Sequence, residues 1–194
     1  MEIPEEQAQK DISTPLPLLL CLPGPLSRKW RYLGPVIAIV GGSVGLVGAF
    51  IQETLHGSFF GPFVAGPMIE EALKPSGVYF LLAKWPRVLY NRLDTAFLAA
   101  LGGLTFGILE NFVYLNIYFP SHSPELVLFR YTAGLVLHAL CSFIVGFGIN
   151  QRLVDSVKGH IPFLSVNKRF FIIPMVIHGL YNLSFLFYES PGGG

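Results

Sequence analysis

Long apolar runs alternate with short polar segments along the chain, and the lengths of these runs predict helices that cross a bilayer. A hydrocarbon core of about 30 Å requires roughly 20 residues of helix. An assignment with fewer spans leaves long apolar segments in water. The five predicted spans are residues 34–51, 59–83, 95–119, 126–149 and 170–187.

Glycine and proline interrupt these apolar runs. Gly41 and Gly45 in the first span, and Gly103 and Gly107 in the third, have the small-residue spacing that lets helix backbones approach closely. The alternative is that both residue types are simply commoner in membrane helices. Three prolines inside the spans predict local kinks or half-helices near polar residues. They are Pro67, Pro75 and Pro174.

Composition agrees with this pattern. Of the 194 residues, 52% are hydrophobic and 13% are charged, whereas about 25% of an ordinary soluble domain is charged. The shortage of charge excludes a disordered chain, a coiled coil and a free cytosolic enzyme. A net charge of +1, with the basic residues in loops, gives no footprint for nucleic acid. We therefore predict an all-α fold: a polytopic membrane helix bundle of about five transmembrane helices.

The two ends of the chain differ from the spans. The first eleven residues are mainly acidic, the wrong sign for a signal peptide, and prolines interrupt the apolar stretch that follows. We predict an irregular cytoplasmic tail over residues 1–33, a membrane-embedded helical domain over 34–187 and a C-terminal tail over 188–194. Cys21 lies in the first tail and Cys141 in an apolar run, so we expect no disulfide between them.

Basic residues predict the orientation of the spans. Lys and Arg precede the first span and occupy the loops between spans two and three and between spans four and five. The loops on the opposite side, at residues 52–58 and 120–125, contain no Lys or Arg. By the positive-inside rule, the N-terminus is cytoplasmic and the C-terminus lies outside, in a cell membrane.

Ionisable residues inside the predicted spans are exceptions to the apolar pattern. Such a side chain at the bilayer centre is unfavourable by about 3 kcal/mol unless it finds a partner. These residues lie near the middle of their spans, so they fall in one layer and can meet across four helices. We therefore predict a polar site near the membrane midplane. Its ionisable members are Glu70, Glu71, Lys74, Glu110, His138 and His178.

Spacing places several of these residues on shared helix faces. Glu70 and Lys74 are four residues apart, in the order that favours an ion pair. Glu71 points about 100° away from Glu70, which leaves one carboxylate paired and the other free. The same spacing gives polar stripes on the other helices. They are Glu110 with Tyr114, His138 with Ser142, and His178 with Asn182.

Three neighbouring polar residues have simpler interpretations. Arg130 lies four residues after the start of its span, and we expect it to extend its side chain to the membrane surface. Asn111 and Tyr114 are expected to pack against Glu110 and satisfy its carboxylate. A single buried Glu–Lys pair or membrane histidine is often only a helix-packing contact, but the co-location of all these groups favours a functional site.

These residue types suit hydrolysis of a peptide bond. A carboxylate can act as general base on water. An imidazole and a nearby amide can stabilise the developing oxyanion. The His-Glu-x-x-His signature of many membrane zinc proteases is absent from the sequence.

In their order and placement, the polar motifs resemble those of the PrsW proteases, part of a wider group that includes the eukaryotic CAAX prenyl endopeptidases. The resemblance covers residues 59–187, about two thirds of the chain, and implies a membrane-embedded endopeptidase with a multi-helix core. The motifs that carry it are Glu70-Glu71-Ala-Leu-Lys74, Glu110-Asn-Phe-Val-Tyr114, the mid-span His138, and His178-Gly-Leu-Tyr-Asn182.

The resemblance also implies roles for individual residues. Glu70 or Glu71 would activate water, while His138 and His178 would orient it or bind the oxyanion, aided by Asn182. The supporting residues would be Lys74, Glu110 and Tyr114.

The resemblance further implies a substrate class. The bacterial PrsW type is associated with cleavage of membrane-anchored anti-sigma factors, so a membrane-anchored protein in the lipid bilayer is the expected partner. The CAAX branch has an Arg four residues after its second Glu, where this chain has Lys74 three residues after Glu71. It also has Phe-x-x-x-His where this chain has Glu110. Prenylated substrates are therefore not expected.

Other functions use the same buried residues. A glutamate mechanism needs no cofactor, whereas a zinc-dependent intramembrane metalloprotease would bind its ion through His138, His178 and Glu70. An ion-coupled transporter would relay protons through these groups, although the sequence has no internal repeat. A non-enzymatic membrane scaffold is a further alternative, because the resemblance extends to the scaffold subunit of gamma-secretase.

Overall fold

The regular elements are helices throughout the part of the chain that the computed structural model describes, which confirms the all-α prediction. The described residues are 28–55, 61–89, 91–118, 120–162 and 167–188. The α-helices are α2 (Arg28–Leu55), α3 (Gly66–Leu73), α4 (Ser76–Lys84), α5 (Arg92–Val113), α6 (Pro124–Phe129), α7 (Leu135–Gly148), α8 (Gln151–Val157) and α9 (Lys168–Tyr188). Three π-helical segments join them, η1 (Gly61–Ala65), η3 (Tyr114–Tyr118) and η4 (Arg130–Gly134), together with the short 3-10 turn η2 (Pro86–Val88).

Three of the five predicted spans are helices long and apolar enough to cross a membrane. Within the described residues these are Lys29–Phe50, Arg92–Tyr118 and Pro124–Gly148. Helix α9, with 21 residues, covers the fifth predicted span. The second predicted span is broken instead into η1, α3 and α4. The chain is thus a membrane protein with at least three candidate spans, and the count of five stays a prediction.

Proline explains the break in the second predicted span. Pro75 separates α3 from α4 because its ring removes a backbone N–H and crowds the preceding turn. Pro67 lies at the start of α3, a position that proline tolerates well. Pro174 lies inside α9, which continues through it. Of the three prolines, Pro75 is therefore the one that separates two helices, and the break lies directly after Lys74.

Helix α2 begins earlier than the sequence pattern predicts. It starts at Arg28, so the prediction of an irregular tail is wrong for residues 28–33. Trp30 in this first part of the helix packs on Trp85, with 5.0 Å between ring centroids. Aromatic residues of this kind anchor helix ends at the membrane interface, which accounts for helix beyond the apolar run. The rest of the predicted tail and Cys21 lie outside the described residues, whereas Cys141 is buried as a free thiol.

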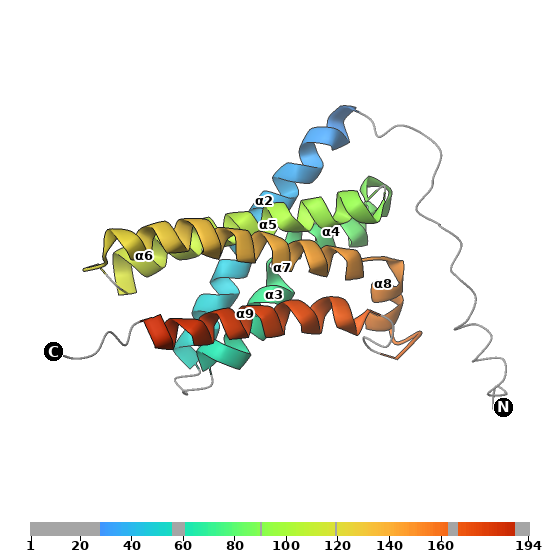
Figure 1. Cartoon of the computed structure of the whole chain (residues 1–194). Coiled ribbons are helices and arrows are strands. Elements are labelled where there is room, and N and C mark those ends of the chain that lie inside the picture. The colour runs from blue at the N-terminus through green and yellow to red at the C-terminus, as the bar shows by residue number, and fades with distance from the viewer. Residues whose placement is uncertain (1–27, 56–60, 90, 119, 163–166, 189–194) are drawn as a thin grey trace.

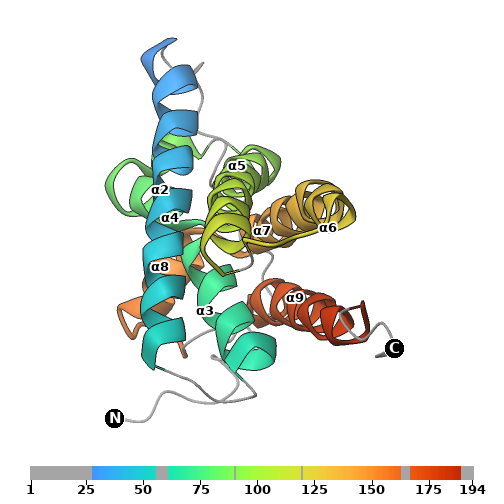
Figure 2. The same ribbon diagram turned by 90° about the vertical axis from the view of Figure 1, so that its left-hand side faces the viewer.

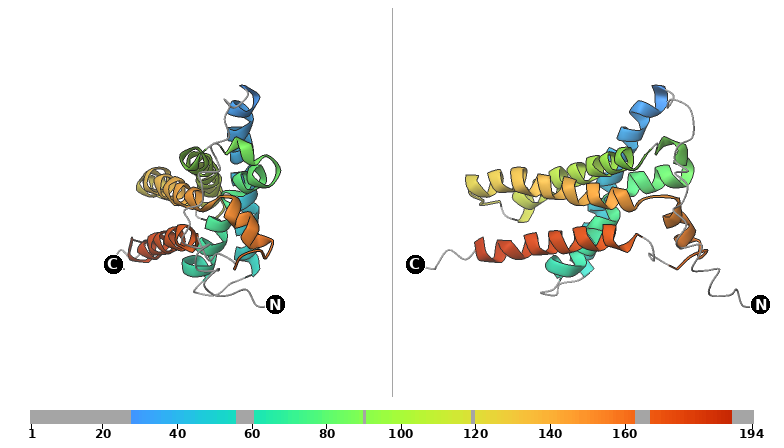
Figure 3. Two further views of the ribbon diagram at one scale, coloured as in Figure 1. Left: turned by 90° about the vertical axis from the view of Figure 1, so that its right-hand side faces the viewer. Right: turned by 45° about the vertical axis from the view of Figure 1, so that its right-hand side comes forward.

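Helices α5, α7 and α9 run side by side, and α2 crosses them steeply (Figures 1 and 2). The left view of Figure 3 looks along these three helices and shows α9 in a layer of its own below α5 and α7. Helix α3 lies between α2 and α9, with contacts to both. The space enclosed by α3, α5, α7 and α9 is where the polar residues meet.

Glycines allow the helices to approach at backbone distance. A side chain at Gly41 would collide with the backbone of Gly77 at the start of α4. A side chain at Gly103 would collide with Ser142 and with the His138 carbonyl on α7. The opposite face of α2 carries valines that are more than half exposed, as expected for a surface in lipid. The small-residue spacing in these two helices therefore marks close helix contacts.

Candidate active site

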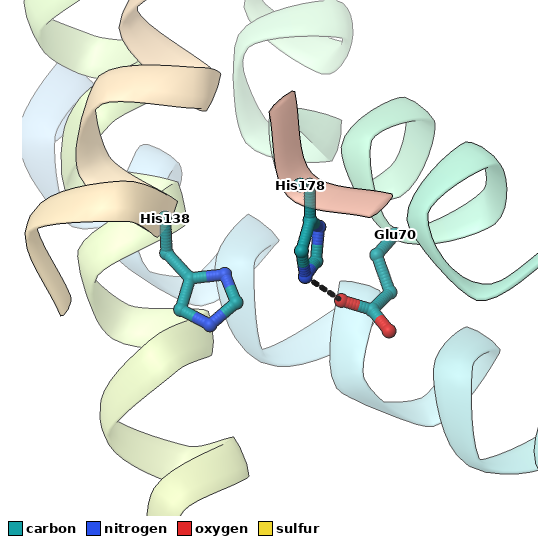
Figure 4. Close-up of side chains that lie close together, drawn as sticks. All are labelled: Glu70, His138 and His178. Carbon is teal, nitrogen blue, oxygen red and sulfur yellow. Dashed lines mark ion pairs between the residues drawn. The ribbon is translucent and has the colours of Figure 1, made fainter. Parts of the chain in front are cut away.

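Four helices bring the ionisable residues of the predicted site together. All six side chains are at most one quarter exposed, and each has a contact of 3.4 Å or less to another member. Figure 4 shows three of them facing one another from α3, α7 and α9. The six are Glu70 and Glu71 on α3, Lys74 at its C-terminal cap, Glu110 on α5, His138 on α7 and His178 on α9.

The Lys74 ammonium lies at the centre of this cluster and is fully buried. Its Nζ is 2.6 Å from Glu71 Oε1 and 2.8 Å from His138 Nδ1. Glu70 Oε2 lies further from Nζ, at 3.4 Å. The four-residue spacing favoured Glu70 as the partner of Lys74, but the shorter pair is made with Glu71. One carboxylate is paired closely and the other more loosely, and Glu70 is the looser one.

Two carboxylates outside the centre each hold a histidine. Glu110 Oε2 lies 3.0 Å from His138 Nε2, and Glu71 Oε1 lies 2.8 Å from His178 Nδ1. An ionised carboxylate only accepts hydrogen bonds, so these ring nitrogens donate to it, and in the neutral imidazole the opposite nitrogen carries the lone pair. The lone pair of His138 is then at Nδ1, toward Lys74, and that of His178 is at Nε2, 3.7 Å from Glu70 Oε2.

The inner atoms of this arrangement form a group that can hold a metal ion. Glu70, His138 and His178 each offer one ligand atom, and the three atoms lie within 4.8 Å of one another. Glu70 Oε2 is buried and has no hydrogen-bond partner among the described residues. Nitrogen and carboxylate ligands, with a carboxylate behind each histidine, are typical of catalytic zinc sites. These are the three residues that the sequence predicts as ligands in the metalloprotease alternative.

Arg130 does not reach the membrane surface, so that prediction is wrong. The residue is only 7% exposed and points into the bundle from the first position of η4. Its Nη2 donates to Glu110 Oε2 at 3.1 Å, and its Nε donates to Asn111 Oδ1 at 2.9 Å. The guanidinium finds its counter-charge and its acceptor on α5, so it is satisfied inside the protein without extending to water.

Asn111 and Tyr114 surround Arg130. The Asn111 side chain accepts from Arg130 and donates to the Arg130 carbonyl at 2.9 Å. The guanidinium carbon lies 3.8 Å from the centre of the Tyr114 ring, a cation–π geometry. The structure shows Glu110 bonded to Arg130 and His138 rather than to Asn111.

Two other predicted residues lie one turn beyond the histidines. Asn182 on α9 donates its amide N–H to the Pro62 carbonyl of η1 at 2.9 Å. Ser142 on α7 is fully buried where Gly103 of α5 packs against it. Neither has a described hydrogen bond to the six ionisable residues, so the oxyanion role of Asn182 stays a prediction.

The sequence held one unused signal for Arg130. A guanidinium within an apolar run usually faces a partner inside the bundle, and Glu110 of the preceding predicted span was an available carboxylate. A second pattern points away from function. Residues 41–45 read Gly-Gly-Ser-Val-Gly, which matches the Gly-x-Ser-x-Gly of serine hydrolases. They lie inside α2, however, and not on the strand-to-helix turn that such a nucleophile requires.

Comparison with known proteins identifies the family. Residues 31–193 match the model of the PrsW family intramembrane metalloproteases. No curated protein and no solved structure matches the chain. The matched range contains the six clustered residues and all but the first two residues of the three helices that have the length and composition of membrane spans. The chain therefore belongs to the PrsW family, a family of membrane proteases.

Proposed function

We propose that the protein is a membrane-embedded endopeptidase that hydrolyses a peptide bond of a membrane-anchored protein, with Glu70 as the group that activates water. The observation that carries this proposal is Glu70 Oε2, which has no described hydrogen bond and a looser 3.4 Å ion pair with Lys74, beside two histidines that other carboxylates hold in place. Glu71 also has an oxygen without a described hydrogen bond, but that side chain is fully buried and bonds Lys74 and His178 through its other oxygen. The Glu70 side chain is 11% exposed, which favours it as the carboxylate that meets water.

In the proposed reaction, Glu70 takes a proton from water as the water oxygen bonds to the carbonyl carbon. The C–N bond then breaks, and Glu70 returns the proton to the leaving amine nitrogen. The Nε2 lone pair of His178 accepts the second hydrogen bond of the water and orients it, while the Nδ1 lone pair of His138 accepts from the Lys74 ammonium at 2.8 Å. The Lys74 ammonium is the nearest positive charge for the developing oxyanion.

The family description names a metal, and the residues present fit one. Glu70, His138 and His178 would hold the ion, because their inner ligand atoms converge and the outer nitrogen of each histidine is fixed by a carboxylate. A divalent ion bound there supplies Lewis-acid polarisation of the reacting groups. Lys74 must then release His138 Nδ1, which it contacts at 2.8 Å.

The direct test compares the new N-termini that cleavage creates in membrane proteins. It uses membranes of cells that express the wild-type protein or a single variant. Glu70→Gln keeps the shape of the side chain but removes the base, so we expect cleavage to fall at least a hundredfold. Glu125→Gln, at an exposed position at the start of α6, is the matched control and should cleave like wild type. Equal products from wild type and Glu70→Gln would contradict the proposal.

Metal dependence is measured on the purified protein with an intact peptide that spans a cleavage site identified in that experiment. Loss of cleavage after dialysis against a chelator, with recovery on adding Zn²⁺, would assign Glu70 to the metal-binding group. Cleavage that persists in protein shown to be metal-free would leave Glu70 as the general base.

A further inference from the structure

Arg130 is a buried charge that the proposed reaction does not use. It begins η4, two turns before His138 on the same continuous helix. A buried guanidinium is strongly unfavourable unless its partners are well placed. Its retention next to the cluster therefore requires an explanation beyond packing.

Its contacts lead directly to the site. Arg130 Nη2 and His138 Nε2 lie 3.1 Å and 3.0 Å from the same atom, Glu110 Oε2. The Glu110 side chain is 24% exposed and has no other described hydrogen bond that would fix this oxygen. Without Arg130, the carboxylate is free to turn toward the exposed side and away from His138.

Arg130 is itself held from several directions. Asn111 bonds both its side chain and its carbonyl, and the Tyr114 ring lies against the guanidinium. Tyr114 begins η3 and Arg130 begins η4, so two π-helical segments meet at this contact. Such wide turns occur frequently at functional sites. The guanidinium is thus a fixed donor that Glu110 meets at one oxygen.

We propose that Arg130 is a positioning residue, which holds Glu110 so that the carboxylate keeps the proton of His138 on Nε2 and the lone pair of Nδ1 directed into the site. This role rests on the proposed function for its consequence in catalysis. The order of contacts is Arg130, Glu110, His138 and then the centre of the cluster. Arg130 also neutralises Glu110, which leaves the Lys74 charge to the two carboxylates of α3.

The test reads the tautomer of His138 directly. Protein with ¹⁵N-labelled histidine in detergent micelles gives separate ring signals for its five histidines, and His138→Gln assigns one set. In wild type we expect His138 to carry its proton on Nε2. Arg130→Met keeps length and removes both donors. His138 Nε2–H then loses its fixed acceptor, Glu110, so its ring signals should shift or broaden even though the Lys74 ammonium still donates to Nδ1. Arg130→Lys keeps the charge but cannot donate to Asn111 and Glu110 together, as the guanidinium does. The change in its His138 signals should therefore be intermediate between wild type and Arg130→Met.

Arg87→Met, at an exposed position in η2, is the matched control and should leave the His138 signals unchanged. In a cleavage assay, kcat of Arg130→Met should fall about 10- to 100-fold with KM nearly unchanged. Unchanged His138 signals in folded Arg130→Met or Arg130→Lys would overturn the positioning role. If wild type cleaves nothing while these variants still shift or broaden the His138 signals, the proposed function fails and the positioning role stands.

Discussion

Lys74 neutralises a buried carboxylate, but it also occupies a position that a bound metal ion would need. Its ammonium neutralises Glu71 at 2.6 Å and lies against the His138 nitrogen that a metal ion would need. Both Lys74 and Glu71 are fully buried, so water does not screen them. The ammonium and a divalent ion therefore compete for the same negative surroundings, and the protein without metal depends on the lysine for charge balance.

Removal of Lys74 should make the protein depend on metal for stability. Lys74→Met leaves Glu70 and Glu71 buried without their cation, and loss of one partner of a buried pair lowers the free energy of unfolding by about 3–5 kcal/mol. Zn²⁺ should restore more stability to this variant than to wild type, because it binds without displacing the ammonium. Thermal melts in detergent, with chelator and with Zn²⁺, measure both effects.

Lys84→Met, at the exposed end of α4, serves as the control for loss of a lysine. Equal melting of Lys74→Met and wild type under chelation would show that the buried ammonium does not balance the cluster.

At the scale of helices, the contact of α5 with α7 sets the position of His138. A Cβ atom on Gly107 would lie 2.7 Å from His138 Cδ2 and 3.1 Å from Leu135 Cδ2. The distance is shorter than side chains tolerate, so the imidazole occupies space that only glycine leaves. The site therefore depends on a residue that carries no functional group.

Gly107→Ala should displace the His138 ring and reduce cleavage at least tenfold, since small misplacements of reacting groups are costly. Gly34→Ala is the matched change on α2, where the added methyl would meet Val88 Cγ1 at an ordinary 3.5 Å. Cleavage rates and melting temperatures of the two variants, measured side by side, check this. Gly107→Ala with wild-type activity would show that α5 and α7 separate without disturbing His138.

Sequence patterns predicted the helices and the residues that meet. They predicted less well which partner each side chain contacts most closely and where Arg130 points. Mid-span placement brought Glu70, His138 and His178 together correctly, because a buried charge in an apolar run needs a partner. Lys74 keeps helical dihedral angles, so both Glu70 and Glu71 lie at regular neighbour spacings from it, and spacing alone does not select the closer partner. The inward course of Arg130 depended on Asn111 and Glu110 of another helix, and local sequence contains no such long-range contact.

Over the whole molecule, the basic segments gather at one end of the bundle. The N-terminus of α5, the C-terminus of α7 and the N-terminus of α9 lie together near α8, while α6 and the C-terminus of α9 lie at the other end (Figure 1). Lys and Arg of the connecting segments belong to the first end. The positive-inside rule predicts that this end is cytoplasmic, and the orientation stays a prediction.

Single cysteines at the two ends would test the orientation, after Cys21 and Cys141 are replaced by serine. A membrane-impermeant maleimide added to intact cells should label Ser123→Cys, before α6, because that segment is predicted to lie outside. Lys158→Cys, after α8, should be labelled only once the cells are lysed. The opposite labelling pattern would reverse the orientation.

The glycine contacts of α2 determine which of its positions can tolerate substitution. Gly41, Gly42 and Gly45 face the backbones of Gly77, Gly102 and Lys74, so the helix without a site residue still sets where the lysine lies. Its outer valines are more than half exposed, as expected for a surface in lipid. A saturation-mutagenesis profile of α2 should therefore show positions that tolerate few substitutions about every three to four residues, separated by positions that tolerate most of them. Along its glycine face, α2 would be constrained as strictly as the motifs that contain the site residues.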